Sequence, residues 1–131
     1  MSVPVLIGVA MLAIVVGERV VSSQQTPDAF ACIYKVSENF QKNGPRPEDM
    51  PVLQGHVKYL RDLAEQGTSL FSGHTLNQDE SAFGLLVVRA DSEAAARKIM
   101  EADPIIHAGL VQGTVIPFGV GTIGKDASAL K

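Results

Sequence analysis

The pattern of hydrophobic and polar residues predicts four strands after the first 28 residues. Segments 30–36 and 82–89 are rich in β-branched and aromatic or other large hydrophobic residues and have the length of strands. The second is hydrophobic at successive positions, which indicates a central strand covered on both faces. Segments 69–72 and 114–120 are the other two predicted strands. Pro117 places the last at an edge or a bulge, because proline has no N–H to donate to a neighbouring strand.

Hydrophobic residues recur at helical spacing between the first two strands. Asp49 is a candidate N-cap, and the predicted helix ends near Gln66, where Gly67 stops it. The buried stripe of this helix is predicted at Leu53, Val57, Leu60 and Ala64. One face of the helix should therefore pack on the sheet.

A second helix is predicted from Glu93 to about Ala102, after a cap at Asp91 or Ser92. A short turn of helix should follow over 104–108, with Asp103 as its cap and Gly109 at its exit. Two other stretches are predicted to be irregular: residues 37–49, which contain Asn43-Gly44-Pro45 and Pro47, and the polar turn 77–80.

The resulting order, β-α-β-β-α-β, is typical of a ferredoxin-like α+β fold with a four-stranded antiparallel sheet and two main helices. Two helices cover only one face of such a sheet. We therefore expect a homodimer, in which a second copy covers the other face. The chain has no internal repeat. We divide it into an apolar leader at 1–23, a folded domain at 24–121 and a flexible tail at 122–131.

The leader is apolar from Met1 to Gly17 except for Ser2, and Glu18 and Arg19 close it. A bilayer span needs about 17–25 apolar residues, so a full span is marginal. The length suits a signal peptide and residues 21–23 form a passable cleavage site, although the basic start is missing. Export or membrane anchoring is the favoured interpretation. A cytoplasmic protein with this segment packed into its fold stays open as the alternative.

Composition narrows the classes of function. The 131 residues include 11 Lys+Arg and 14 Asp+Glu, a net charge of −3, with no basic cluster to bind a phosphate backbone. Only 5% of the residues are aromatic, which also disfavours an RNA-recognition sheet, and no nucleic-acid partner is expected. The single cysteine, Cys32, excludes an intramolecular disulfide and a cysteine-based zinc site. Without a local partner it should pack as a small apolar residue rather than act as a nucleophile.

Few residues are candidates for chemistry. His56 lies on or beside the predicted helix stripe, where it would be either a hydrogen-bonded core histidine or an acid–base group. Asp103 is equally a helix cap or a carboxylate partner for such a histidine. Ser72-Gly73 would let a backbone approach a ligand, or form an ordinary turn. Arg46 and Lys58 would meet an anionic substrate or stay solvated. His74 and His107 show no ligand spacing, so no metal site is predicted.

Several of these pieces, in this order and spacing, resemble the YCII-related family over about residues 30–119. They are His56, the Leu60-x-x-Leu63-x-x-Gln66-Gly67 run, Ser72-Gly73, the helix start at Asp91-Ser92, Asp103-Pro104 with Gly109, and Val115-x-Pro117-Phe118. The resemblance implies a ferredoxin-like unit that dimerises through its sheets into a dimeric α+β barrel. It also implies a His56–Asp103 pair in a cleft between sheet and helices, with Ser72 nearby. The chain departs from the family at His74, where a proline is usual, and in its apolar leader.

The leading hypothesis is a cofactor-free acid–base enzyme of lyase, dehydrohalogenase or isomerase type acting on a small cyclic or phenolic compound. In it His56 is the base or acid and Asp103 orients it, while Ser72, Gly73, His74 and Arg46 are candidate substrate contacts. The fold relatives of the family, which include muconolactone-isomerase-like enzymes, suggest this chemistry. The alternative is a non-catalytic dimer that binds a small molecule or partner in the same cleft. A third hypothesis is an enzyme of the same barrel type that binds haem or reacts with oxygen.

Overall fold

A computed structural model describes residue 27 and residues 29–125, so the predicted leader and the last six residues lie outside the described part. The sheet has four strands in the order β2-β3-β1-β4, and every neighbouring pair is antiparallel. The strands are β1 (Ala29–Val36), β2 (Ser69–His74), β3 (Gly84–Arg89) and β4 (Val111–Phe118). The predicted central strand is confirmed, since β3 lies between β2 and β1. The predicted edge position of the strand with Pro117 is confirmed for β4.

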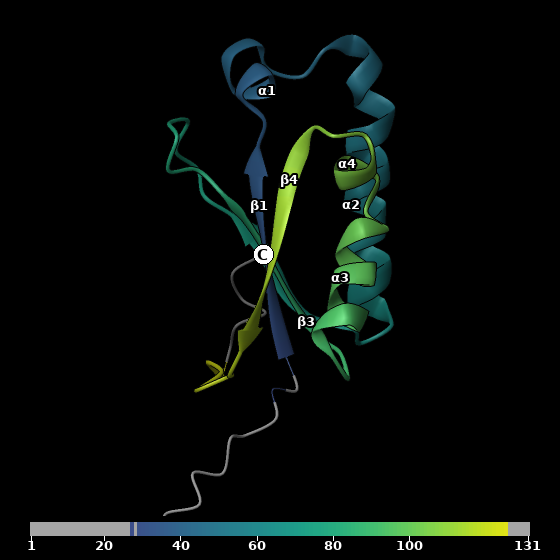
Figure 1. The fold of residues 1–131 in the computed structure, drawn as a ribbon, viewed down its shortest axis with the longest axis vertical. Helices are drawn as coiled ribbons and strands as arrows, with labels where there is room; N and C mark the ends of the chain where they lie inside the picture. Colours follow the sequence, from purple (N-terminus) through teal and green to yellow (C-terminus); the bar gives the residue numbers. More distant parts are fainter. Residues whose placement is uncertain (1–26, 28, 126–131) are drawn as a thin grey trace, which may run out of the picture.

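Three helices lie on one side of the sheet (Figure 1). They are α2 (Met50–Glu65), α3 (Glu93–Glu101) and the short α4 (Pro104–His107). This arrangement confirms the ferredoxin-like α+β fold. The sheet ends at β2 and β4, so the described part of one chain is not a closed barrel. Within that part no helix is long and hydrophobic enough to cross a bilayer.

Residues 37–49 contain two short helices, α1 (Glu38–Asn43) and the 3-10 turn η1 (Pro47–Asp49), so the prediction of an irregular connection is wrong. The side chain of Ser37 caps α1 by accepting from the Phe40 N–H at 3.2 Å. Gly44 then ends α1 at a φ of 67°. The glycine and the prolines around it therefore end the helix rather than prevent it.

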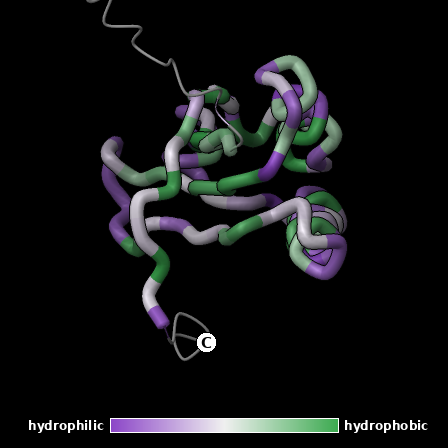
Figure 2. The backbone as a smooth tube through the Cα atoms, turned by 90° about the horizontal axis from the view of Figure 1, so that it is seen from below, coloured by the Kyte–Doolittle hydropathy of each residue, from purple (hydrophilic) through white to green (hydrophobic). Residues whose placement is uncertain are grey.

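The buried side of α2 is rotated relative to the prediction. Leu63 is buried and Leu53 and Leu60 pack against the core, but Val57 is 54% exposed and Ala64 is also exposed. In Figure 2 the helices alternate hydrophobic and hydrophilic segments, as expected of helices with one packed face. The rotation places His56 at the inner margin of α2, with its side chain 19% exposed.

The core lies between this helix layer and the sheet. Alternate residues of each strand point toward the helices, because successive side chains of a strand point to opposite faces. In one register row Ser72, Leu86, Cys32 and Val115 lie side by side across all four strands. Three of these, Leu86, Cys32 and Val115, are buried in the core. The next helix-facing row forms the candidate site.

Candidate functional site

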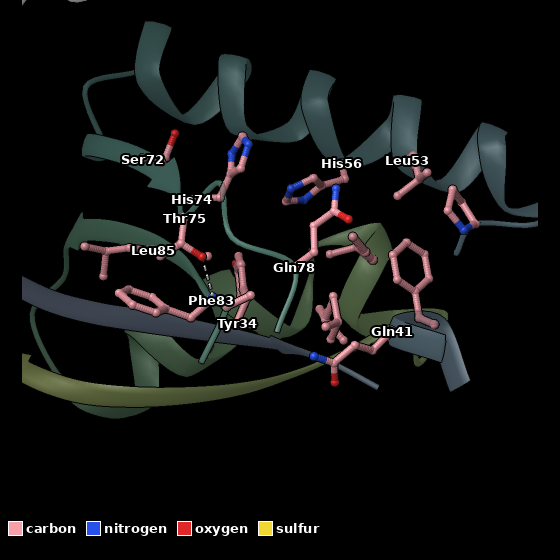
Figure 3. Close-up of a pocket in the computed structure, with 18 of the residues that line it drawn as sticks. Tyr34, Gln41, Leu53, His56, Ser72, His74, Thr75, Gln78, Phe83 and Leu85 are labelled. Atoms are coloured by element: carbon pink, nitrogen blue, oxygen red, sulfur yellow. Dashed lines mark hydrogen bonds between the residues drawn. The ribbon is translucent and has the colours of Figure 1, made fainter. Parts of the chain in front are cut away.

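A cavity of about 910 Å³ lies between the sheet, α2 and the loop between β2 and β3. This volume is within the range of about 300–1,000 Å³ that is common for small-molecule sites. Hydrophobic side chains from the helices and strands line one part of it, including Leu53, Leu60, Ile105 and Val111. Polar uncharged side chains from β2 and the loop line another, including Ser72, Thr75, Asn77 and Gln78 (Figure 3).

One register row of the sheet explains why the space exists. His74, Gly84, Tyr34 and Gly113 lie side by side across the four strands. This row is two residues along β1 from Cys32, so it faces the helices. Tyr34 is therefore flanked by glycine on both neighbouring strands.

The two glycines have different surroundings. A Cβ on Gly113 would collide with the side chain of Met100, so the core fills the space beside β4. A Cβ on Gly84 would meet only Tyr34, at 3.4 Å from its Cβ, and the Gly73 carbonyl oxygen at 3.9 Å. Gly84 lines the cavity, and its missing side chain leaves the space between Tyr34 and His74 open.

His56 and Asp103 meet beside this cavity, although 47 positions separate them in the chain. His56 Nδ1 lies 2.9 Å from Oδ1 and 2.8 Å from Oδ2 of Asp103. The preceding Gly55 lies at this contact, where a Cβ would stand 3.4 Å from Cγ of Pro104, an ordinary van der Waals distance. A glycine next to the histidine and a proline next to the aspartate thus mark the point where α2 and α4 touch.

Asp103 is completely buried and its carboxylate accepts hydrogen bonds from three elements. Oδ1 accepts from the Ile105 N–H at 3.1 Å, which makes Asp103 the N-cap of α4 as predicted. Oδ2 accepts from the Tyr34 hydroxyl at 3.3 Å. Together with the contact to His56, these two hydrogen bonds hold the Asp103 carboxylate in one orientation. No buried polar side-chain atom in the described ranges lacks a partner.

The Tyr34 ring also supports the histidine. It stands edge-on to the His56 ring, with centroids 6.1 Å apart and planes at 71°. Burial raises the pKa of Tyr34 well above its usual value, and the nearby charge of Asp103 raises it further. The hydroxyl therefore keeps its proton and remains a donor to Asp103.

The contact with Asp103 selects one tautomer of a neutral His56. A carboxylate can only accept, so Nδ1 must carry the proton and Nε2 keeps its lone pair. Nε2 has no hydrogen-bond partner among the described residues. The imidazole lines the cavity, where this arrangement can take a proton from a bound molecule and return it.

Cys32 lies on the same strand but is not arranged as a nucleophile. It is fully buried, and burial raises its pKa to about 11, helped by the charge of Asp103. A thiol with so little thiolate at neutral pH is unreactive. Among the described residues no three His, Cys, Asp or Glu side chains are grouped as they would be around a metal ion.

Three of the predicted substrate contacts line the cavity. Ser72, Gly73 and His74 all do so, and His74 points from β2 toward α2 in Figure 3. The prediction that the first two end their strand is wrong, because β2 continues to His74 and pairs it with Gly84. The continued pairing is what turns His74 toward the helices.

Arg46 is not among the residues that line this cavity. Its guanidinium pairs with Asp49 at 3.1 Å and with Glu48 at 3.3 Å, and it faces a smaller pocket below α1. Asp49 stands at the N-cap of α2 without capping it, because its carboxylate accepts from the backbone and side chain of Arg46 instead. Lys58 pairs with Asp62 at 2.6 Å, and His107 is exposed at the end of α4.

Three residues that line the cavity were not predicted from the sequence: Tyr34, Gly84 and Gln78. A tyrosine on the core face of a strand needs a hydrogen-bond partner, and a glycine inside a strand often marks a place where a ligand comes close; both signals were present. Gln78 lies in the polar turn and points toward His56 in Figure 3. Its chain segment is irregular, and no local pattern could have placed it over the cavity.

Comparisons with known proteins agree with the fold. The YCII-related domain matches residues 29–118. No curated protein sequence matches the chain. A solved structure of the 5-chloro-2-hydroxyhydroquinone dehydrochlorinase TftG from Burkholderia phenoliruptrix, in complex with 2,5-dihydroxybenzoquinone, is similar with a TM-score of 0.54. It is 20% identical, and the match covers 71% of this chain and 95% of that one. The family match spans most of the chain, which therefore belongs to the YCII-related family.

Proposed function

We propose that the chain is a cofactor-free acid–base enzyme that removes hydrogen chloride from a chlorinated, hydroxylated ring compound. The observation that carries the proposal is the contact of His56 Nδ1 with both oxygens of Asp103, at 2.9 and 2.8 Å, beside a cavity. The similarity to a dehydrochlorinase supports dehydrohalogenation over isomerisation within the lyase and isomerase chemistry that the pair can perform.

In this proposal His56 is the base and then the acid. Nε2 takes a proton from a ring hydroxyl, and the resulting imidazolium is stabilised by the Asp103 carboxylate behind it. Asp103 also orients the ring, because the bonds from Ile105 and Tyr34 fix its own position. Ser72 and His74 are the proposed partners of the substrate oxygens.

The reaction balances within one ring. The proton taken from one hydroxyl is returned to the carbon that carries chlorine, which makes that carbon tetrahedral and leaves a ketone at the oxygen. The neutral Nε2 of His56 then takes the proton of a second hydroxyl and releases it to solvent, the electron pair of that oxygen enters the ring, and chloride leaves. A chlorinated trihydroxybenzene becomes a hydroxybenzoquinone, and the sum is the loss of one proton and one chloride. Chloride carries away the two electrons that the ring loses, so the ring is oxidised to a quinone without a separate oxidant.

The test is chloride release from 5-chloro-2-hydroxyhydroquinone under anaerobic conditions, followed together with quinone absorbance. His56→Gln should lower kcat by about 100-fold or more, the usual contribution of a positioned acid–base group. His107→Gln is the matched control, because that histidine is exposed at the end of α4 and outside the cavity. Equal rates in His56→Gln and the unsubstituted chain would contradict the mechanism.

The alternative is a non-catalytic dimer that binds a small molecule in the same cavity. One observation favours it: Asp103 caps α4 and is fully hydrogen-bonded, so the pair also has a structural reason to exist. Saturable binding of 5-chloro-2-hydroxyhydroquinone without chloride release would select this alternative.

We also propose that a second copy of the chain packs on the sheet face that points away from the helices. Phe71, Val87, Ala31 and Ile116 form one apolar row across that face. The outer two are 53% and 48% exposed, whereas Val87 and Ala31 are already buried within one chain, so the exposed outer residues would carry the contact in a two-fold dimer. Ile116→Lys should lower the mass measured by light scattering from that of a dimer to that of a monomer.

A further inference from the structure

The described residues that line the cavity include hydroxyl and amide groups and the imidazoles of His56 and His74, but no lysine, arginine, aspartate or glutamate. In the described part of the chain, the basic residues next in sequence to this lining bond elsewhere: Arg46 pairs with Glu48 and Asp49. Lys35 Nζ donates to the backbone carbonyls of Glu80 and Ala82, both at 3.2 Å, and Lys42 lies 3.7 Å from Glu38.

Charged groups of both signs lie near the cavity: Lys35 Nζ stands 5.8 Å from the ring of Phe83, which lines the cavity, and two acidic groups are also near. With His56 neutral, the His56–Asp103 pair has a formal charge of −1, and with His56 protonated it has none, so in neither state is it positive. Asp79 follows Gln78 in the loop, and hydrogen bonds from Ser81 hold the pKa of its carboxyl below the usual value. Among the described lining residues a carboxylate or phosphate would find no lysine or arginine to pair with, only the imidazoles of His56 and His74, and a charge that loses water without a fixed opposite charge is costly to bury.

We infer that the cavity selects uncharged hydroxylated ring compounds and rejects rings that carry a carboxylate or phosphate. This inference deepens the proposed function and rests on it only in taking the cavity as the substrate site. The hydrophobic side chains hold the ring, and the amide and hydroxyl groups of the β2–β3 loop bind its oxygens. Gln78, which points toward His56, is the loop residue we assign to the end of the ring opposite the histidine (Figure 3).

The test compares two ring compounds that differ in charge but hardly in size, 2,5-dihydroxybenzamide and 2,5-dihydroxybenzoate. Binding to the full chain is measured by calorimetry at neutral pH, without any requirement for turnover. The benzamide should bind about tenfold tighter or more, since the benzoate must bury an unpaired charge. Equal affinities, tighter binding of the benzoate, or binding of neither compound would overturn the inference.

A charge placed in the loop should reverse the preference. Gln78→Lys should raise benzoate affinity by about tenfold. Gln78→Met, a substitution of similar length without charge, should keep the preference for the benzamide. Residue 78 is exposed in an irregular loop, so neither variant should disturb folding. No gain in benzoate affinity in Gln78→Lys would contradict the placement of the ring beside this residue.

These binding experiments test the charge selection independently of the proposed reaction. If the benzamide binds preferentially but no chloride is released from the chlorinated compound, the charge selection stands and the reaction is wrong. If chloride is released but benzoate binds as well as benzamide, the reaction stands and the charge selection is wrong.

Discussion

The Tyr34 hydroxyl donates a hydrogen bond to Oδ2 of Asp103 across 3.3 Å, joining β1 to the residue that caps α4. The two residues are 69 positions apart. Because Asp103 is also bound by His56 on α2, three elements of the fold meet at one carboxylate. The position of the histidine therefore depends on the packing of the whole domain.

Removing the Tyr34 hydroxyl should affect catalysis by loosening the position of Asp103 and His56, and should leave substrate binding unchanged. Tyr34→Phe keeps the edge-on ring contact with His56 but leaves Asp103 with fewer restraints. We expect kcat to fall by about three- to tenfold with little change in KM, and stability to fall by about 1 kcal/mol. Steady-state chloride release and urea unfolding measure the two effects. A rise in KM at constant kcat would instead make the tyrosine a substrate contact.

The tautomer of His56 should depend on the charge of Asp103. Long-range proton–nitrogen NMR should show the proton on Nδ1 whenever the ring is neutral, because the carboxylate accepts from that nitrogen. In Asp103→Asn the amide can accept or donate, so a mixture of tautomers is expected. The exposed His107 serves as the internal reference, since it should be the same in both proteins. A single Nε2-protonated form in the unsubstituted chain would refute the geometry.

A side chain at position 84 should lower the affinity for a ligand without lowering the stability of the fold. A Cβ at this position meets only Tyr34 at ordinary contact distance, and the backbone there does not have a positive φ. Gly84→Val should therefore fold at least as well, since β-branched residues favour strands. Affinity for 2,5-dihydroxybenzamide should fall by about tenfold, because the side chain occupies the cavity. Gly119→Ala, where a Cβ meets nothing within 4 Å, is the matched control.

Stability should fall at alkaline pH in a way that Cys32 controls. Burial raises the pKa of its thiol to about 11 from an ordinary value of 9.0, so the folded state holds the proton more tightly than the unfolded chain. This contribution is complete below pH 9 and is lost as pH rises through about 11, by roughly 1.4 kcal/mol per pH unit.

Urea unfolding at pH 8 and pH 10.5 checks the expectation. Cys32→Ala should show a weaker dependence on pH than the unsubstituted chain, whatever its stability at pH 8. Tyr34 acts in the same direction at higher pH, because its own pKa is raised by burial, and this part should persist in the cysteine variant. The same slope in both proteins would show that the thiol does not contribute.

The order of elements could be read from hydrophobic spacing because β1, β3, β4 and the two long helices, α2 and α3, each contribute residues to the same core. The prediction failed at 37–49, where residues 43–45 mark the end of a helix that Ser37 had already started. It also placed Val57 on the buried stripe, because a stripe read at helical spacing fixes the period of a helix better than its rotation about its axis.

The candidate site was predictable only in part, for a physical reason. His56 and Asp103 were paired through family resemblance, since nothing in a spacing of 47 residues brings two side chains together. Their contact depends on how α2 packs against α4, which is a tertiary property. Arg46 attracted attention as a cation near a helix start, but the local sequence also supplied its acidic partners, Glu48 and Asp49.

The contacts that hold the β2–β3 loop in place allow some of its side chains to be replaced. Lys35 holds the loop through the carbonyls of residues 80 and 82 and lies over the Phe83 ring at 5.8 Å, and Thr75 pairs with Phe83 at the base of the loop. Within the loop, the side chains of Asn77 and Asp79 also bond to each other and to Ser81. Leu76 and Gln78 are exposed and make no such bond, so new side chains at 76 and 78 could be diversified in a library while the histidine and its carboxylate stay in place. This scaffold therefore offers a route to altered selectivity with unaltered chemistry.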